Sequence, residues 1–313
     1  MATNPPLTLS PDAEGLARAA ALLRDGHLVA IPTETVYGLA ARADSEAAVA
    51  AIYRAKGRPD FNPLIVHVAD LTAARKLAVL DERAEALAAR FWPGPLTLVV
   101  PLRPASGIVP AVTAGLPTVA LRVPAHPLTR ALLAELGLPL AAPSANRSMG
   151  VSPTTPAHVA ASLGEGVAAI WDGGACAQGL ESTIVALREG GGWSLLREGP
   201  VTRAQISAVL GSEPVEIAKG IEAPGQMLRH YSPGKPVRLN APAAAADEFH
   251  IGFGPVLGDC SLSPAGDLAA AAARLYACLH QAAAAPQPRI AVAPVPQEGI
   301  GAAINDRLAR ASR

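Results

Sequence analysis

The chain has 313 residues, of which 26 are basic and 26 acidic, so its formal net charge is zero. This balance argues against a tight, nonspecific nucleic-acid coat, which usually carries a clear basic excess, although it is compatible with a local basic groove. Half of the residues are hydrophobic but only 4% are aromatic, which favours a packed α/β or helical protein over an aromatic-rich binding surface.

The N-terminal segment has no basic stretch followed by an apolar one, so we predict no secretory signal and expect a cytoplasmic protein without membrane contact. Ser10, Pro11 and Asp12 predict the start of a helix that Gly26 ends. The pattern then predicts, in chain order, strand 28–31, polar segment 32–35, helix 45–53, strand 63–68, helix 82–91, strand 96–100, strand 119–123, helix 127–136, strand 138–142, a helix from Pro156 capped by Thr155, strands 167–171 and 182–187, a strand ending near Arg197, and helix 203–210. This alternation indicates an α/β fold with a mixed or largely parallel sheet.

Residues 212–236 contain four prolines and no convincing periodicity, which is typical of a linker. A second, compact αβ unit follows, with strands 237–239, 249–253 and 289–293 and helices 267–283 and 300–311 predicted. We therefore expect a catalytic domain over 1–211, a linker or lid over 212–236 and a small domain over 237–313. Because the last unit is small for independent stability, we expect it to pack on the first.

Several familiar signatures are absent from the sequence. It has no GxxxxGK[ST] phosphate loop, no HExxH and no GxSxG. The segment 252–254 (GFG) predicts a turn at the end of a strand rather than a dinucleotide site. Cys176, Cys260 and Cys278 are too few and too scattered for a disulfide framework or a CxxC metal site.

Polar clusters instead follow several predicted strands, where open α/β sheets place their ligands. Segment 32–38 (PTETVYG) is rich in hydroxyls, which can equally cap local backbone groups. Lys56 and Arg58 flank a glycine just after a helix, and Asn62 and His67 follow. A point-charge lysine and a forked arginine around a glycine suit phosphate binding, with a solvated helix end as the alternative.

Two further clusters lie later in the chain. Segment 144–152 offers three serines, an asparagine and an arginine, more donors than one helix end requires. Segments 172–174 (DGG) and 181–183 (EST) also flank strands. Together the four clusters predict a polar cleft suited to a polyphosphate and a small zwitterion.

At these residues the sequence resembles the YrdC-like family of threonylcarbamoyl-AMP synthases. The matching stretches are PTETVYGLA (32–40), KGRP with NPLIVHV (56–68), WPGPLTLVV (92–100), TAGLPTVALRVPAHP (113–127), APSAN with SPT (142–154), DGG with ESTIV (172–185) and LLREGP (195–200). Segment 224–236 (PGQMLRHYSPGKP) and the unit after it are similar to the longer, two-domain form. The resemblance implies a large YrdC-like twisted mixed-sheet domain followed by a small αβ (Rossmann-like) domain.

The resemblance also implies a reaction. The threonine amine takes up bicarbonate, and an oxygen of the resulting carbamate attacks the α-phosphate of ATP and expels pyrophosphate. Such a transfer needs in-line positioning and charge neutralisation, normally with Mg²⁺ bound to ATP, and we predict no metal ligand from the protein's own side chains. The product would pass to the tRNA threonylcarbamoyltransferase machinery that modifies the adenosine next to the anticodon, with weak or indirect RNA contact.

Carried onto this chain, the resemblance implies two groups of site residues. ATP would contact Lys56, Arg58, Thr118, Ser144, Asn146, Ser152, Arg197 and Tyr231, with Lys56 and Arg58 as the catalytic cations and Tyr231 as part of a lid. Threonine would contact Thr33, His67, Arg122, Ala142 and Ser182, with Arg122 pairing its carboxylate. From the sequence alone, a buried strand histidine and a structural ion pair remain alternatives for His67 and Arg122. We expect Lys56 and Arg58 to be exposed cations in the cleft.

One position departs from the family pattern. Family members usually have glycine after the serine of APSANxS, whereas this chain has Met149 followed by Gly150. A methionine with positive φ would be strained by roughly 1 kcal/mol, which would displace the loop 148–152.

Three other functions compete with this interpretation. A related enzyme could make a carbamoyl-adenylate from a different amine, and the pocket for the amine would distinguish it. A non-catalytic RNA-binding module is disfavoured by the zero net charge and the few aromatic residues for stacking. A catalytically dead paralogue is disfavoured because Lys56, Arg58, Ser144 and Asn146 are all present.

Overall fold

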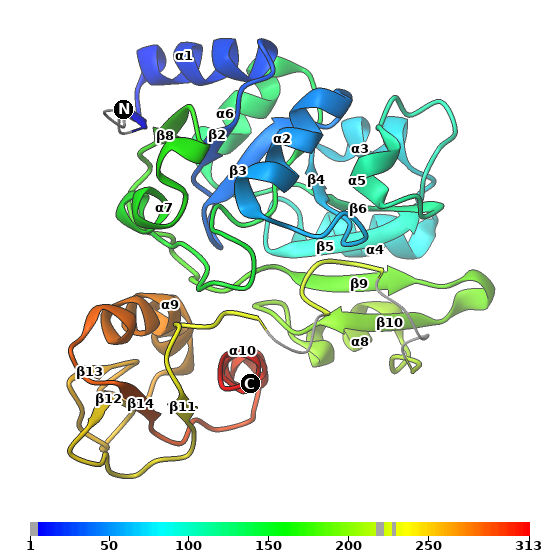
Figure 1. The fold of residues 1–313 in the computed structure, drawn as a ribbon. Coiled ribbons are helices and arrows are strands. Elements are labelled where there is room, and N and C mark those ends of the chain that lie inside the picture. Colours follow the sequence, from blue (N-terminus) through cyan, green and yellow to red (C-terminus); the bar gives the residue numbers. More distant parts are fainter. Residues whose placement is uncertain (1–5, 217–221, 227–229) are drawn as a thin grey trace.

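The computed structural model of the protein describes residues 6–216, 222–226 and 230–313, which form two packed units (Figure 1). The first unit contains β1 (Leu7–Leu9), α1 (Ala13–Arg24), β2 (Val29–Ile31), β3 (Gly38–Arg42), α2 (Glu46–Lys56), β4 (Ile65–His67), α3 (Leu71–Leu77), α4 (Glu82–Phe91), β5 (Leu96–Pro101), α5 (Pro110–Thr113), β6 (Thr118–Arg122), α6 (Pro127–Leu136), β7 (Leu140–Ala141), α7 (Pro156–Leu163), β8 (Ala169–Trp171), β9 (Thr183–Leu187), β10 (Trp193–Arg197) and α8 (Arg203–Leu210). No helix in this described part of the chain combines the length and apolar character needed to cross a membrane.

Side-chain caps fix where many of the helices begin. Asp12, Ser45, Asp81 and Thr155 each accept a hydrogen bond from the backbone N–H three residues later, which satisfies a donor that the first helical turn leaves free. Of the three residues that predicted the start of the first helix, Asp12 is the one that caps it.

The strands of the first unit form one mixed sheet. Within the described residues it has ten strands in the order β1-β8-β2-β3-β7-β4-β6-β5-β9-β10. Strand β4 pairs in parallel with β6 and antiparallel with β7, while β5 pairs antiparallel with β6 and in parallel with β9. This confirms the expected mixed α/β fold, and it brings chain segments that are far apart in sequence to the middle of one sheet.

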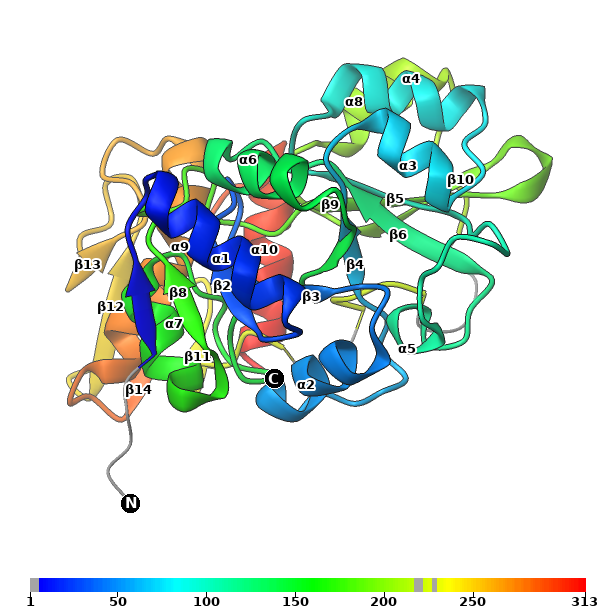
Figure 2. The same ribbon diagram turned by 90° about the horizontal axis from the view of Figure 1, so that it is seen from above.

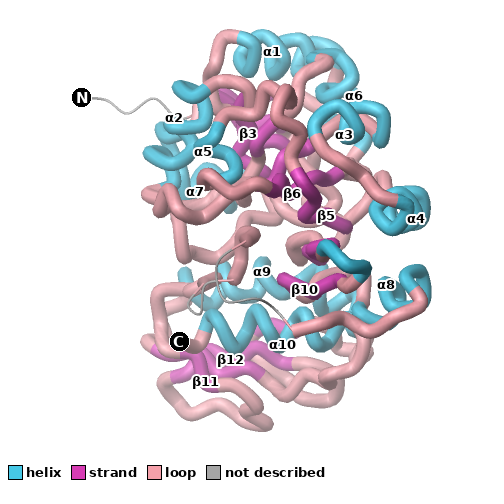
Figure 3. The backbone as a smooth tube through the Cα atoms, turned by 90° about the vertical axis from the view of Figure 1, so that its right-hand side faces the viewer, coloured by secondary structure: helices cyan, strands magenta, loops and turns pink. Residues whose placement is uncertain are grey.

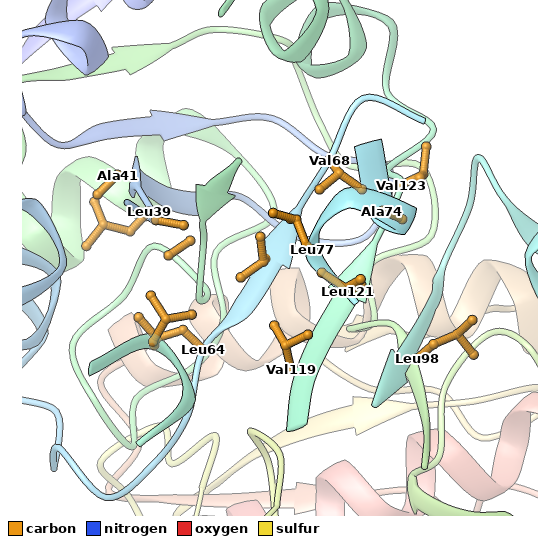
Figure 4. Close-up of a cluster of buried hydrophobic side chains, with 14 of the residues drawn as sticks. Leu39, Ala41, Leu64, Val68, Ala74, Leu77, Leu98, Val119, Leu121 and Val123 are labelled. Carbon is orange, nitrogen blue, oxygen red and sulfur yellow. The ribbon is translucent and has the colours of Figure 1, made fainter. Parts of the chain in front are cut away.

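Small aliphatic side chains fill the core, as the composition requires. Figure 4 shows Leu39 and Ala41 of β3, Leu121 of β6 and Leu77 of α3 within one buried cluster. On another part of the sheet, α1 and α6 lie side by side over a second cluster that includes Trp171 (Figure 2).

The second unit is a small parallel sheet with two helices. Its elements are β11 (Val237–Arg238), β12 (Glu248–Gly252), β13 (Cys260–Ser261), α9 (Leu268–Ala284), β14 (Arg289–Val292) and α10 (Ile300–Ala311), with strand order β11-β14-β12-β13. All three of these strand pairings are parallel. Helices α9 and α10 lie between this sheet and the first unit (Figure 3).

The two units share a buried interface. Val36, Val151 and Leu180 of the first unit join the hydrophobic cluster formed by α9, α10 and the small sheet. Gly179 lies against the backbone of α9 so closely that an added Cβ would be 2.5 Å from the Cα and carbonyl oxygen of Ala273. The second unit thus packs on the first, as its small size predicts.

Candidate active site

A small cavity lies where the centre of the large sheet meets the segment between α8 and β11. Its lining residues are Thr33, Thr35, Val36, Gly38, Arg58, Ile65, His67, Arg122, Ala142, Pro143, Ser144, Glu181, Ser182, Arg197, Pro224, Gly225, His230 and Tyr231. The cavity measures about 50 Å³. One water needs about 10–15 Å³ by the same measure, so the space holds a few waters.

Nine residues predicted from the sequence share this cavity, and four do not line it. The nine are Thr33, Arg58, His67, Arg122, Ala142, Ser144, Ser182, Arg197 and Tyr231. The four outside the lining are Lys56, Thr118, Asn146 and Ser152. Thr118 is half-buried at the start of β6. Lys56 and Asn146 hold the loop that carries Ser144, and Ser152 donates to Glu181 Oε1.

Lys56 and Arg58 are both buried, so the expectation of exposed cations is wrong. Their residues are only 3% and 9% exposed. Lys56 Nζ donates to the carbonyl oxygens of Ser144 and Asn146, each at 2.5 Å, and therefore holds the loop from behind. Burial and the nearby charge of Arg58 lower the pKa of Lys56 well below its ordinary value.

Arg58 reaches the cavity from a well-defined position. Its Nε donates to the carbonyl oxygen of Asn62 at 3.2 Å and its Nη2 to that of Pro63 at 2.9 Å. Burial lowers the pKa of Arg58 to about 10, which still leaves the guanidinium charged at neutral pH. A fixed cation in a cavity with little water is suited to binding phosphate.

The loop after Ser144 is held by its own polar groups and by the linker. Asn146 Nδ2 donates to the carbonyl oxygens of Arg147 and Gly150, at 2.9 and 2.8 Å. Met149 has a φ of 68°, which is the positive φ that the family's glycine pattern suggested. Its carbonyl oxygen accepts a hydrogen bond from Ser232 N at 2.8 Å, so the strained residue ties this loop to the linker.

The threonine side of the predicted site contains an ion pair that the sequence reading left open. Arg122 Nη2 lies 2.6 Å from Glu34 Oε1, and Arg122 Nε donates to the carbonyl oxygen of Gly94 at 3.2 Å. Burial favours a raised pKa for Glu34, but the charge and hydrogen bond of Arg122 outweigh it and lower the pKa. Within the described residues, Arg122 Nη1 forms no hydrogen bond.

His67 lines the same part of the cavity as a neutral imidazole. It is buried, and burial lowers its pKa to about 3. Its Nδ1 atom is buried and has no hydrogen-bond partner in the described protein. An unpaired buried ring nitrogen is costly, so a bound molecule that contacts it would be stabilised.

Hydroxyl groups complete the wall, but some already have partners. Thr33 Oγ1 donates to the carbonyl oxygen of Val36 at 2.6 Å, which is the local capping role considered for this segment. Ser182 Oγ lies 2.7 Å from Thr97 Oγ1 and accepts from Arg197 Nη2 at 3.1 Å. Arg197 Nε also donates to the carbonyl oxygen of Ser182, at 2.9 Å, so these two side chains form one rigid unit.

The linker contributes the predicted Tyr231, and other residues around it were not among the predicted site residues. Tyr231 is buried with a φ of 63°, and its ring is 4.1 Å from that of His230 and 5.6 Å from that of Tyr276. Glu181 also lines the cavity, and Arg307 of α10 lies 2.9 Å from it. The sequence predicts Tyr231 and singles out the segment 181–183 that contains Glu181, but no local pattern marks Tyr276 or Arg307.

Glu181 is ionised despite its burial. Burial alone would raise its pKa, but the charges of Arg307 and Arg197, with hydrogen bonds from Ser152 and Arg307, hold the pKa at about 2.

The described residues contain no group of three or more His, Cys, Asp or Glu side chains that could hold a metal ion.

Comparisons with known proteins match nearly the whole chain. A model of the Sua5/YciO/YrdC family, described as telomere recombination, matches residues 21–199. A second model, described as threonylcarbamoyl-AMP synthase, C-terminal domain, matches residues 201–313.

Several curated relatives carry the name threonylcarbamoyl-AMP synthase. The relative from Bacillus subtilis is 48% identical over 239 residues, which cover 74% of this chain and 68% of the relative. The relative from Pyrococcus abyssi is 47% identical over 229 residues, covering 70% of this chain and 66% of the relative. These alignments span about two thirds of the length of each relative.

A solved structure extends the match across both units. The crystal structure of P. abyssi Sua5 complexed with L-threonine has a TM-score of 0.89 and 34% identity, and the match covers 98% of this chain and 97% of that chain. The Escherichia coli YciO structure, at 23% identity and a TM-score of 0.55, shares the fold of the first unit. The chain therefore belongs to the Sua5/YciO/YrdC family, in the two-domain form whose members are named threonylcarbamoyl-AMP synthases.

Proposed function

We propose that the protein is a nucleotidyltransferase that converts L-threonine, bicarbonate and ATP into threonylcarbamoyl-AMP, pyrophosphate and water. The observation that carries the proposal is the convergence of Arg58, His67, Arg122, Ser144 and Ser182 on one cavity. A relative with the same two-unit fold has been crystallised with L-threonine, which supports threonine as the amine.

The free groups of the cavity suggest how threonine is held. Arg122 is fixed through Nη2 and Nε, so we assign its Nη1 to the amino-acid carboxylate. His67 Nδ1, which has no protein partner in the described structure, would meet a polar group of the same ligand. In this arrangement Glu34 orients Arg122 and does not contact threonine.

The triphosphate would lie towards Arg58, Ser144 and Arg197. Two fixed guanidinium groups neutralise charge that develops on the phosphates, and the Ser144 hydroxyl donates a hydrogen bond. An oxygen of the threonine carbamate attacks the α-phosphorus, the bond to the bridging oxygen breaks, and pyrophosphate leaves with that electron pair. The protein supplies position and charge rather than a covalent nucleophile.

The donor set fits Mg²⁺ that arrives bound to ATP. The carboxylate in the cavity wall, Glu181, already accepts hydrogen bonds from Ser152, Tyr276 and Arg307. Phosphate oxygens are therefore the better ligands, and Mg²⁺ bound to them would neutralise charge on the leaving pyrophosphate.

The linker predicted over 212–236, of which residues 217–221 and 227–229 lie outside the described structure, would act as a lid over the nucleotide. Its residues Pro224, Gly225, His230 and Tyr231 form one wall of a cavity that is too small for ATP. We expect this wall to move when ATP enters and the product to pass, in the cytoplasm, to the tRNA threonylcarbamoyltransferase machinery.

Mass spectrometry of the product formed from ATP, bicarbonate and threonine tests the proposal. We expect the mass of threonylcarbamoyl-AMP together with pyrophosphate, and much slower pyrophosphate release with serine or carbamoyl phosphate. Equal turnover of serine and threonine would identify a related enzyme with a different amine.

A pair of substitutions tests the role of the cavity cation. Arg58→Met should lower the rate of adenylate formation by about 10²-fold, as the loss of a preorganised charge at a reaction centre does. Arg54→Met, at an exposed position of α2, the helix that ends just before Arg58, should leave the rate unchanged. Equal rates in the two variants would refute the assignment of Arg58.

A further inference from the structure

The carboxylate of Glu181 marks the point where the second unit touches the cavity wall. It follows a loop of the first unit and precedes Ser182. Its oxygens accept hydrogen bonds from Ser152 Oγ at 2.5 Å, from Tyr276 OH at 2.8 and 2.9 Å and from Arg307 Nε at 2.9 Å. Two of these three donors, Tyr276 and Arg307, come from α9 and α10.

Arg307 connects three segments around the cavity. The residue has no exposed surface. Besides Glu181, its Nη1 binds Asp306 Oδ2 and its Nη2 donates to the carbonyl oxygen of Glu198, each at 2.8 Å. Its Cζ also lies 5.4 Å from the ring centre of Tyr231, within range of a cation–π interaction. One side chain of α10 thus holds the first unit and the linker together at the site.

The charge of Arg307 matters because of what the cavity has to bind. An ionised carboxylate beside a triphosphate repels it unless a cation compensates the carboxylate. Removing one partner of a buried ion pair leaves the other charge uncompensated. Without Arg307, Glu181 would lose its direct ion pair and would keep only the more distant charge of Arg197 and the hydroxyls of Ser152 and Tyr276.

We propose that Arg307 is a positioning residue for ATP: from the second unit it neutralises Glu181 and fixes the ring of Tyr231, and so completes the nucleotide side of the cavity. This inference rests on the proposed function in taking the cavity to bind ATP. It gives the second unit a role in the binding of substrate beyond that of packing.

The test compares Arg307→Met, Arg307→Met combined with Glu181→Gln, and the control Arg274→Met. Arg274 is an exposed arginine of α9 that donates to the carbonyl oxygen of Ser261. Binding of a non-hydrolysable ATP analogue is measured by calorimetry in the full chain, and KM for ATP and for threonine are measured alongside. Thermal unfolding of each variant shows whether it is folded.

Arg307→Met should weaken binding of the analogue about tenfold or more, with a smaller change in KM for threonine. Adding Glu181→Gln should restore most of the lost affinity, since it removes the uncompensated charge, and Arg274→Met should bind normally. A purely structural role for Arg307 predicts no rescue, so lost affinity that Glu181→Gln fails to restore overturns the inference. Unchanged affinity in Arg307→Met overturns it as well.

A second variant keeps the test decisive if Arg307→Met does not fold. Arg307→Lys keeps the charge but cannot reach all three partners, so it should weaken binding less and should likewise be relieved by Glu181→Gln.

The two proposals fail separately. A wild-type protein that binds the analogue but makes no threonylcarbamoyl-AMP contradicts the proposed function and leaves this inference standing.

Discussion

Gly179 offers a direct test of how the two units are joined. Its φ is +67°, where an alanine costs about 1–2 kcal/mol of backbone strain. A new Cβ would also lie 2.5 Å from the backbone of Ala273 in α9, and such overpacking costs a further 1–3 kcal/mol or so. Gly179→Ala should therefore lower stability by about 2–5 kcal/mol and push α9 away from the first unit.

Gly211 provides the matched control. It has the same φ of +67°, but an added Cβ would meet nothing within 4 Å. Gly211→Ala should therefore carry only the backbone cost, about 1–2 kcal/mol. Urea denaturation measures the free energy of unfolding of both variants, and the difference between their losses is the contribution of the contact with α9. KM for ATP is measured in both variants as well. Equal losses of stability in the two variants, with equal KM values, would refute the argument that this close approach holds the units in register.

Two further predictions concern strain and protonation. Met149→Gly should relieve about 1 kcal/mol of backbone strain at a φ of 68°, partly offset by the greater freedom of glycine in the unfolded chain. Thermal unfolding should therefore show a small gain in stability. A loss of stability above about 1 kcal/mol would contradict this. The pKa of His158, stacked 3.8 Å from His280 across the interface of the units, is lowered by burial from 6.5 to about 4, and that of Glu181 is held at about 2. Both groups bind fewer protons in the folded state than in the unfolded state. Stability should therefore fall as the pH drops from 6.5 to 4, because of His158, and further below 4.5, because of Glu181. A urea midpoint that stays constant from about pH 7 to 3 would disprove this prediction.

Much of the fold could be predicted because its signals are local. Helices 82–91, 127–136, 203–210 and 300–311 match the structure residue for residue. Apolar spacing marks all four, Asp81 and Thr202 cap two of them, and Pro127 and Gly137 bound a third. Strand β3 was missed because its sequence, GLAAR, lacks the β-branched residues typical of strands. It is a strand because β2 and β7 pair with it on either side.

The location of the site could be predicted because several of its residues lie at or near the ends of strands. Arg58, His67 and Ser182 lie on one cavity as expected. The direction of each side chain was not predictable: Lys56 turns to two carbonyl oxygens, and Arg122 is paired with Glu34. These side-chain directions depend on partners that are far away in the sequence, and the spacing of residues along the chain does not reveal them.

The order of strands in the large sheet has a consequence for how the protein is made. Leu7 of β1 pairs with Ala169 of β8, and β5 joins β9, so neighbours in the sheet are separated by long stretches of chain. A ribosome must therefore synthesise more than half of the polypeptide before the first strand has a partner. We expect slow folding, with early strand edges left open to aggregation or to chaperones until that partner emerges.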